Sequence, residues 1–452
     1  MIKPTYNLLM TDAEIRTIFS GKKITLMGLG LLGRGAGDAA FLAGAGAELI
    51  VTDMKTEAEL APSLERLKRF PNIVYHLGGH HLEDFENRDM IIRAPNAPLD
   101  SPFLAHARKN GIPIEMDASL FAKLSGAMIV GITGTRGKST VTHFIYAIAQ
   151  AAGKNPRIGG NERDTATLTL LPETQPDDLV ILELDSWQLQ GFMESKISPH
   201  ISVWTNFMRD HMNYYKNDMD RYFEDKAAIA RFQKPGDFFI TRSDIKGKIE
   251  TRFGPLAAKT ILNPELPADW KVGIPGGHNR ANAAFARAAA RCLNVSDEVI
   301  RPAIESFAGL PGRLEFLGEK NGIEFYNDSN STTPDAAIAA IAALAPKHKP
   351  IILIAGGSDK ELQFESLAKE IAASVHAAVF FKGSATEKLT PLLPKDFSSK
   401  TVAHMPDAVT AALGFANPGS IILLSPAATS FGIFANEYDR GDQFRAIVQR
   451  LK

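Results

Sequence analysis

Residues 130–140 have the sequence Val-Gly-Ile-Thr-Gly-Thr-Arg-Gly-Lys-Ser-Thr, and this stretch decides the fold. Apolar residues over 127–132 predict a buried strand before it, and apolar residues at helical spacing from Val141 onward predict a helix after it. The glycines between them allow a tight turn whose backbone N–H groups converge on phosphate oxygens. Lys138 supplies a positive charge for the outer phosphates, and the Ser139 hydroxyl can bind Mg²⁺.

The match to the usual phosphate-loop pattern is imperfect. Ile132 stands where that pattern has its first glycine, and Gly131 and Gly134 flank it. The order of strand, loop and helix is still the one that the chemistry requires. We therefore predict a nucleotide site made by Gly134, Thr135, Arg136, Gly137, Lys138, Ser139 and Thr140.

Composition limits the classes of function. The chain has 452 residues, enough for about three domains. Its formal net charge of −1 provides no basic field for nucleic acid and no polybasic membrane patch. Cys292 is the only cysteine, so neither a disulfide framework nor a cysteine metal site is expected. No apolar run approaches the ~18 residues that span a bilayer, and residues 1–16 lack the apolar core of a signal peptide. We expect a cytoplasmic protein that acts on small molecules.

The N-terminal region predicts a βαβ unit. A strand over Lys22–Met27 leads into Gly28-Leu29-Gly30-Leu31-Leu32-Gly33, an Ala-rich helix and a second strand over Glu48–Thr52. Asp53 lies twenty residues after the last glycine of this G-x-G-x-x-G motif. Alone, the motif indicates either a dinucleotide site or a Rossmann-like domain for another phosphorylated ligand. Asp53 then either holds a ribose or uridine hydroxyl or caps the next helix.

Strand and helix patterns alternate along the rest of the chain. Further strands are predicted over Leu179–Leu184, Ile201–Thr205, Asp237–Thr241, Ile323–Tyr326, Pro350–Ala355, Ala377–Phe381 and Ser420–Leu424. The fold class is therefore α/β, with three tandem domains over 1–116, 117–309 and 310–452. We predict a Rossmann-like N-terminal domain, a central P-loop domain with a mostly parallel sheet, and a Rossmann-like C-terminal domain. Ligands are expected at the carboxyl ends of the strands.

Several central residues are candidates for metal chemistry. Glu183 ends a buried strand downstream of the phosphate loop, where a carboxylate can hold Mg²⁺, and Asp185 is a weaker candidate. His211 follows the next strand and either ligates a metal or phosphate or is a partly buried polar residue. The local sequence around Lys226 predicts only an ordinary lysine on a helix surface.

Polar residues also mark the C-terminal half. Asn279 and Asn282 share one helix face, and either contact adenine or ribose or cap the helix. Arg313 is a candidate phosphate contact. A polar loop, 327–333, ends at Thr333, which with Pro334 predicts a helix start. The six polar residues before Thr333 exceed what a cap requires.

Together these motifs resemble the Mur ligase family. The residues that carry the resemblance are Gly131–Thr140, Leu182–Leu189, Thr205–His211, Gly276–Asn282, Leu310–Glu315 and Tyr326–Ser329. The short N-terminal domain, with Leu424–Ser430 and Arg440-Gly441, resembles the D-glutamate-adding members in particular. The resemblance covers nearly the whole chain.

The resemblance implies an ATP-dependent ligase of peptidoglycan precursor synthesis. ATP would phosphorylate the carboxylate of UDP-N-acetylmuramoyl-L-alanine, and the amine of D-glutamate would attack the acyl phosphate. Two Mg²⁺ ions are implied, with Ser139, Glu183 and His211 at ligand positions. Lys226 matches a family lysine that CO₂ carbamylates into an anionic metal bridge. The resemblance further implies a C-terminal domain that binds the amino acid and closes on ATP. We expect the protein to be a monomer.

The resemblance also assigns binding positions. Lys138, Glu183, His211 and Lys226 match the catalytic positions. Nucleotide contacts beyond the phosphate loop match Asn279, Asn282, Arg313 and Asp328. Substrate contacts match Gly30, Leu31, Asp53, Asn161, Gln188, His211, Lys360, Ser430 and Phe431.

The chain departs from the family pattern at three positions, and the first two concern amino-acid specificity. Asn330 stands where such ligases commonly carry lysine, Glu437 stands at an aromatic position, and Asp185 replaces a serine. Arg136, where asparagine is frequent, is a candidate compensating charge. The alternatives are a ligase for another amino acid such as L-glutamate, a folylpolyglutamate synthetase, a non-catalytic nucleotide-binding module, or an NAD-dependent oxidoreductase.

Overall fold

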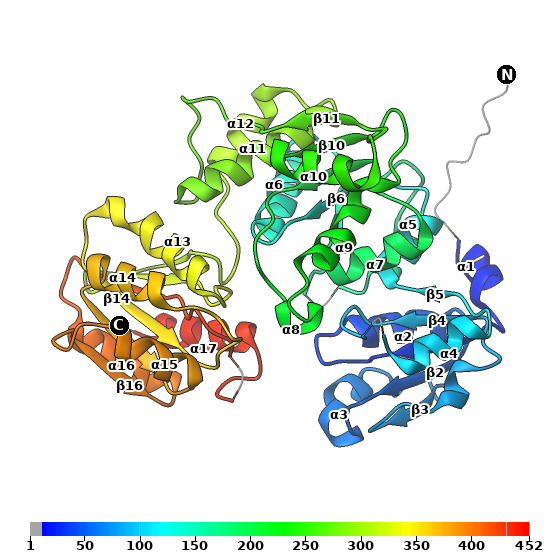
Figure 1. Cartoon of the computed structure of the whole chain (residues 1–452), viewed down its shortest axis with the longest axis horizontal. Helices are drawn as coiled ribbons and strands as arrows, with labels where there is room; N and C mark the ends of the chain where they lie inside the picture. The colour runs from blue at the N-terminus through cyan, green and yellow to red at the C-terminus, as the bar shows by residue number, and fades with distance from the viewer. Residues whose placement is uncertain (1–10, 99, 164, 431, 452) are drawn as a thin grey trace. The chain divides into compact units, whose positions relative to one another are not determined.

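The computed structural model describes residues 11–98, 100–163, 165–430 and 432–451 (Figure 1). The chain forms two compact units. The first comprises Met1–Asp269 with Ala281–Ile304, and the second Trp270–Arg280 with Glu305–Lys452. The first unit contains two sheets and the second contains one.

The N-terminal sheet is entirely parallel, with the order β3-β2-β1-β4-β5. Its strands are β1 (Lys23–Met27), β2 (Glu48–Asp53), β3 (Val74–Leu77), β4 (Met90–Arg93) and β5 (Ile114–Glu115). The helices are α1 (Asp12–Phe19), α2 (Arg34–Gly44), α3 (Glu57–Glu65), η1 (Leu82–Phe85) and α4 (Pro102–Lys109). Strand order reverses between β1 and β4, so the glycine loop after β1 lies at the switch point where α/β sheets bind ligands.

The central sheet is also parallel, with the order β11-β10-β9-β6-β8-β7. Its strands are β6 (Met128–Thr133), β7 (Arg157–Gly160), β8 (Leu179–Glu183), β9 (Ile201–Trp204), β10 (Phe238–Thr241) and β11 (Lys259–Leu262). The helices are α5 (Asp117–Leu124), α6 (Lys138–Ala151), η2 (Thr167–Glu173), α7 (Ser186–Ser195), α8 (Met212–Tyr215), α9 (Met219–Arg231), α10 (Ser243–Phe253), α11 (Gly277–Cys292) and α12 (Asp297–Glu305). Because β6 lies between β8 and β9, the phosphate loop emerges between the ends of those two strands.

The third sheet has the order β12-β13-β17-β14-β15-β16, parallel except for the edge strand β12. Its strands are β12 (Glu315–Lys320), β13 (Ile323–Asn327), β14 (Ile351–Gly356), β15 (Ala377–Phe381), β16 (Ser399–Val402) and β17 (Ile421–Leu424). The helices are α13 (Pro334–Leu344), η3 (Ala345–Lys347), α14 (Glu365–Ser374), α15 (Ser384–Leu389), η4 (Thr390–Leu392), α16 (Met405–Phe415) and α17 (Glu437–Arg450).

The predicted fold class is confirmed: three α/β domains with mostly parallel sheets. Every strand predicted from the sequence is present to within about one residue at each end. Thr333 is the N-cap residue of α13 as predicted, although its side chain accepts no capping hydrogen bond. The idea that Asp53 caps the next helix is wrong, because Thr56 caps α3. The domain boundaries after residues 116 and 309 stay a prediction.

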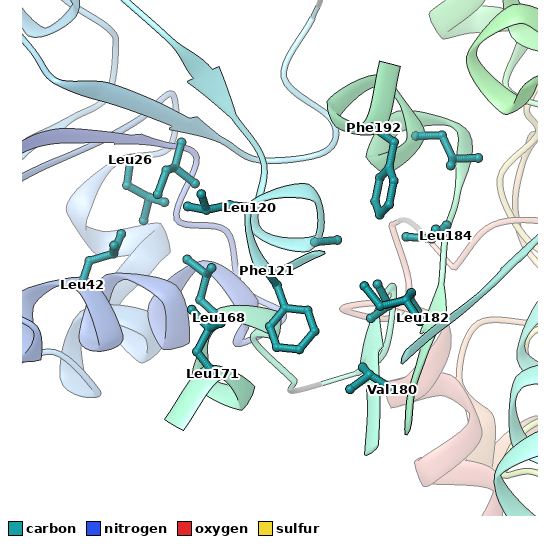
Figure 2. Close-up of a cluster of buried hydrophobic side chains, with 14 of the residues drawn as sticks. Leu26, Leu42, Leu120, Phe121, Leu168, Leu171, Val180, Leu182, Leu184 and Phe192 are labelled. Carbon is teal, nitrogen blue, oxygen red and sulfur yellow. The ribbon is translucent and has the colours of Figure 1, made fainter. Parts of the chain in front are cut away.

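One hydrophobic core connects the first two sheets. One buried cluster contains Leu26 of β1 and Leu42 of α2 from the N-terminal domain. It also contains Leu120 and Phe121 of α5 and Leu182 of β8 (Figure 2). Helix α5 and η2 supply apolar side chains between the two sheets. A continuous core of this kind holds the glycine loop after β1 in a defined place relative to the central sheet.

A pair of buried carboxyl groups lies within this connection. Asp38 of α2 and Asp117 of α5 are both almost fully buried, and Asp38 Oδ1 has no hydrogen-bond partner among the described residues. Burial, together with the nearby Asp117 charge, raises the pKa of Asp38 well above its ordinary value, and burial also raises the pKa of Asp117. The folded protein therefore retains protons here that the unfolded chain releases.

We expect Asp38→Asn to stabilise the protein at pH 8 by about 1–3 kcal/mol, because the neutral amide has no negative charge to bury beside Asp117. Because the folded-state pKa is raised, the wild type loses stability as pH rises from about 4 through the folded pKa, and the variant lacks this loss. Thermal unfolding at pH 6 and pH 8 measures the difference. Asp396→Asn, at an exposed carboxylate, is the control; an equal effect of both substitutions would contradict the assignment.

No helix in the described part of the chain is long and apolar enough to cross a membrane.

Candidate active site

The phosphate loop is held by the segment that follows β9. The backbone N–H of Thr135 donates to the Asn206 carbonyl at 3.1 Å, and that of Arg136 donates to Asn206 Oδ1 at 2.8 Å. Thr205 Oγ1 donates to the Arg136 carbonyl at 2.6 Å. Lys138 begins α6, and its Nζ lies 3.1 Å from the Gly134 carbonyl. The loop is thus preorganised, with the lysine over its own turn.

Two loop glycines are required by the packing. Gly134 and Gly137 have φ angles of 149° and 86°. A Cβ at Gly134 would lie 2.0 Å from Thr205 Oγ1, and one at Gly137 would lie 2.4 Å from Asn282 Oδ1. Asn282 therefore lies directly against the phosphate loop, and its role in nucleotide binding stays a prediction.

We expect Gly137→Ala to weaken nucleotide binding at least tenfold, because the added methyl group both strains the backbone and displaces Asn282. Gly153→Ala is the matched control: Gly153 follows the other end of α6 and has a φ of 71°, but open space surrounds its Cβ position. Both substitutions share the backbone strain of about 1 kcal/mol, but only Gly137→Ala brings a methyl group against Asn282. Titration calorimetry should therefore show weaker nucleotide binding for Gly137→Ala alone. Equal affinities of the two variants would contradict this.

Glu183 ends β8 beside the loop and is buried. Its Oε1 accepts a hydrogen bond from Asn161 Nδ2 at 3.2 Å, whereas Oε2 is buried without a partner among the described residues. Asn161 in turn accepts a bond from Arg34 Nη1 at 2.8 Å. An unpaired carboxylate oxygen in a buried position fits a cation ligand. Arg34, at the first turn of α2, was missed by the sequence reasoning.

Lys226 is not on the helix surface, so the prediction from its local sequence is wrong. Its side chain is 1% exposed. Nζ donates to Thr133 Oγ1 and to the Gly134 carbonyl, each at 3.1 Å. Burial, and secondarily the Lys138 charge, lowers the pKa of Lys226 to about 7. The lysine thus lies at the base of the phosphate loop with an amine that is half neutral near pH 7.

The neighbouring Asp225 anchors the same helix. Its Oδ2 accepts hydrogen bonds from Gln190 Nε2 at 2.6 Å and Tyr215 O–H at 2.9 Å, and Arg93 donates to Gln190 Oε1 at 2.8 Å. Burial raises the pKa of Asp225 to about 6. This network fixes α9, and with it Lys226, against α7.

His211 lies at the start of α8 with a φ of 56°. Its ring packs against Trp187, with centroids 4.7 Å apart. Burial lowers the pKa of His211, although the nearby Asp210 carboxylate acts in the opposite direction. A neutral imidazole is the form that ligates metals.

Two further candidates already have partners. Arg136 donates to Asp210 at 2.7 Å, so its charge is paired within the central domain. Asp185 caps α7: its Oδ1 accepts from the Gln188 backbone at 2.8 Å, and Gln188 Oε1 accepts from the Asp185 backbone at 3.3 Å. The side chains of Asp185 and Gln188 therefore stabilise a helix start beside Glu183.

Asp53 organises the glycine loop of the N-terminal sheet. Its Oδ2 accepts hydrogen bonds from the backbone of Leu29 at 2.8 Å and of Gly30 at 3.0 Å, and Oδ1 accepts from the Lys55 backbone. Leu31 is 52% exposed at the tip of this loop. The arrangement leaves the predicted substrate contacts Gly30 and Leu31 at the carboxyl edge of the sheet.

The remaining nucleotide and amino-acid candidates lie in the second unit. Asp328 Oδ2 accepts from Ser425 Oγ at 2.8 Å, and burial raises the pKa of Asp328 to about 6. Arg440 is fully buried and donates to the Ser329 and Ala428 carbonyls at 2.8 and 3.1 Å, which ties together the loops after β13 and β17.

The other predicted positions in this unit differ in burial and in hydrogen bonding. Asn279 Nδ2 donates to the Pro275 carbonyl at 2.7 Å, at the start of α11. Lys360 is exposed and donates to Thr332 Oγ1 at 3.4 Å. Asn330 Oδ1 is buried without a partner among the described residues. Of the others, Ser430 is buried, and Arg313 and Glu437 are partly exposed. Phe431 lies outside the described residues.

The structure thus brings Lys138, Ser139, Glu183, His211 and Lys226 to the carboxyl edge of the central sheet. Asp328, Ser430 and Lys360 belong to the second unit. The roles assigned to all of them stay predictions.

The chain is similar to known proteins over nearly its whole length. Three family models match: the MurD-like N-terminal domain of Mur ligases over residues 22–115, the Mur ligase middle domain over 132–260, and the Mur ligase glutamate ligase domain over 312–428. A UDP-N-acetylmuramoylalanine–D-glutamate ligase of Roseiflexus is 37% identical over 95% of this chain and 99% of its own. Its counterpart in Treponema pallidum is 30% identical over 96% of this chain and 99% of its own.

Solved structures share the fold. The UDP-N-acetylmuramate–alanine ligase of Thermotoga maritima has a TM-score of 0.61 at 18% identity, covering 95% of this chain and 100% of its own. The MurF ligase of the same organism, in complex with ADP, has a TM-score of 0.60 at 14% identity, covering 99% of each chain. With full-length relatives at 30–37% identity, the chain belongs to the Mur ligase family.

Proposed function

We propose that the protein uses ATP to add D-glutamate to UDP-N-acetylmuramoyl-L-alanine in peptidoglycan precursor synthesis. The ligase chemistry is supported by the positions of Lys138, Glu183 and Lys226, which all lie beside the phosphate loop. The amino acid and acceptor are inferred from the names of the full-length relatives. The proposal places the protein in the cytoplasm, as a monomer, with the three predicted domains as its functional parts.

The proposed reaction has two steps. A carboxylate oxygen of the alanyl substrate attacks the γ-phosphorus of ATP, a new P–O bond forms, and the bond to ADP breaks. The amine of D-glutamate then attacks the acyl carbon, the amine loses a proton, and phosphate leaves with the C–O bond electrons. Loop N–H groups and Lys138 stabilise the charge that spreads over the transferring phosphoryl oxygens.

The residues present also fit a divalent cation. Ser139, Glu183 and His211 would hold it, and the unpartnered Glu183 Oε2 is the observation that supports this. When bound, Mg²⁺ neutralises phosphate charge. Arg34 orients Asn161, and Asn161 in turn orients the Glu183 carboxylate.

Lys226 fits carbamylation. Its neutral amine would attack CO₂, forming one N–C bond and releasing one proton, and the product would be an anion at the base of the loop. Thr133 Oγ1 and the Gly134 carbonyl hold the nitrogen in place, and its low pKa supplies the neutral form near pH 7.

The remaining predicted contacts complete the proposal. Gly30, Leu31 and Asp53 would receive the uridine diphosphate end of the substrate, and Asn161 and Gln188 its alanyl end. Asn279, Asn282, Arg313 and Asp328 would contact ATP. Lys360, Ser430 and Phe431 would bind the incoming amino acid, with closure of the C-terminal domain forming the complete site.

Phosphate release from ATP tests the proposal. The assay contains UDP-N-acetylmuramoyl-L-alanine with D-glutamate, L-glutamate or no amino acid. Release that depends on D-glutamate is expected, and it would show that Asn330 and Glu437 are compatible with this substrate. Release with L-glutamate alone would overturn the named amino acid but keep the ligase chemistry, and release with neither would overturn both.

A further inference from the structure

We propose that His76, His81 and Asp84 form a binding site for a divalent transition metal such as Zn²⁺ in the N-terminal domain. The three residues lie around the connection between β3 and η1, residues 78–81. His76 lies in β3, His81 ends the loop that follows it, and Asp84 lies in η1. One potential ligand atom from each residue lies within 4.8 Å of the other two. This site is separate from the phosphate loop and independent of the proposed ligase activity.

The geometry already resembles an assembled ligand set. His76 Nδ1 lies 2.7 Å from Asp84 Oδ1, and the rings of His76 and His81 are tilted by 32° with centroids 5.3 Å apart. On metal binding, the hydrogen bond between His76 and Asp84 would be replaced by bonds from both groups to the ion. Two imidazoles and one carboxylate with an open fourth position suit Zn²⁺ or Co²⁺, whereas Mg²⁺ and Ca²⁺ prefer all-oxygen sites.

The Asp84 carboxylate supplies a second, independent observation. Asp84 is 2% exposed, and its Oδ2 has no hydrogen-bond partner among the residues that the structure describes. A buried carboxylate oxygen normally has a donor or a cation. A hydrogen bond from His76 alone satisfies Oδ1 and leaves Oδ2 without one. A bound cation would satisfy the carboxylate and connect η1 to β3.

The adjacent His80, in contrast, has a structural role in the fold. His80 Nδ1 lies 2.8 Å from Thr52 Oγ1, and its ring packs edge-on against Phe103 with centroids 5.2 Å apart. His80 is therefore committed to the fold, whereas His81 is exposed and faces the His76–Asp84 pair. His81 can therefore be removed without disturbing buried packing.

The site adjoins the end of β2, where Asp53 lies. In β2 and β3, Thr52 is paired with His76 and Asp53 with Leu77. The Gly79 backbone, between His76 and His81, donates to the Asp53 carbonyl at 3.1 Å. A metal that fixes this loop would therefore also fix the backbone of Asp53. The cation is therefore structural, and it stabilises the N-terminal domain next to its glycine loop.

Zn²⁺ binding to the full-length, chelator-treated protein tests the proposal. Bound zinc is counted by competition with a chromophoric chelator in wild type, His81→Ala and His106→Ala. His106 is the matched control, because its Nε2 lies 2.8 Å from Glu86 Oε1 in a histidine–carboxylate pair outside the three-residue group. All three proteins share any Zn²⁺ binding at the phosphate loop. The test therefore uses the difference in bound zinc between wild type and each variant.

We expect wild type and His106→Ala to bind one equivalent more than His81→Ala, with at least tenfold weaker residual binding at this site in the latter. Zn²⁺ should raise the melting temperature of wild type by several degrees more than that of His81→Ala. Asp84→Asn, which preserves shape, should lose the same equivalent. Equal zinc content in wild type and His81→Ala, at any total, would overturn the proposal.

Discussion

Lys138→Ala is expected to lower kcat for ATP-dependent ligation by about 10²- to 10³-fold, the scale on which loss of one preorganised charge contact acts. Nζ of Lys138 lies 3.1 Å from the Gly134 carbonyl, over the turn where the outer phosphates are expected. The lysine charge is most valuable when negative charge spreads over the transferring phosphoryl group. Steady-state phosphate release with saturating ATP measures kcat directly.

Lys154→Ala is the matched control for this substitution. Lys154 is an exposed lysine just beyond the other end of α6, so its removal changes the net charge by the same amount without touching the loop. We expect wild-type kcat from it. An unchanged rate in Lys138→Ala, or an equal loss in both variants, would contradict the phosphate-loop assignment.

The fold was predictable because its strands carry strong local patterns. Strands such as β6, β8 and β14 are runs of buried apolar residues flanked by glycine or polar turns. The strands that sequence reasoning missed are mostly short or exposed at a sheet edge. β3 and β11 have four residues each with no fully buried position, and the antiparallel β12 has none either. Edge strands lack the two-sided burial that makes a strand pattern visible.

Lys226 shows the limit of reading one segment alone. Its helix α9 is buried from Asp225 to Ala230 without a break, because α7, β6 and β9 surround it. A charged residue in a helix normally indicates a solvent face, and the periodicity of α9 contains no sign that this face is covered. Only the family resemblance indicated Lys226 as a site residue.

Arg34 and Asp225 were missed for the same physical reason. Arg34 acquires its importance from Asn161, which is 127 residues away in the chain, and Asp225 from Gln190, 35 residues away. Neither residue belongs to a recognisable local motif. Sequence patterns identify the ends of strands, whereas the pairing of side chains that are distant in the chain depends on tertiary packing.

Lys226→Ala is expected to lower kcat by about 10³-fold and to regain part of the activity when formate or acetate is added. The lysine is 1% exposed, and the substitution leaves space at the base of the loop that a small carboxylate can enter. Such an anion would replace the carbamate group of the modified lysine. Phosphate release with and without the added acids measures the rescue.

Direct detection of the carbamate separates this prediction from a general loss of structure. Wild type equilibrated with ¹³CO₂ should show a carbamate ¹³C resonance that is missing from Lys226→Ala. Lys234→Ala, at an exposed lysine just after α9, should keep both the resonance and full activity. Full activity of Lys226→Ala without added acid, or a wild type without the resonance, would show that no carbamate is needed.

Stability measurements supply the remaining check on Lys226. The folded-state pKa of about 7 lies below the ordinary lysine value of about 10.4, so between these values the unfolded chain binds the extra proton. In CO₂-free buffer, where the lysine is unmodified, its contribution to wild-type stability therefore rises with pH across that window and is lowest below pH 7, where the folded protein must bury a charge. Lys226→Ala has no such dependence. The variant should remain folded and gain stability relative to wild type as pH falls from about 10 to 7, so its inactivity would reflect missing chemistry rather than unfolding.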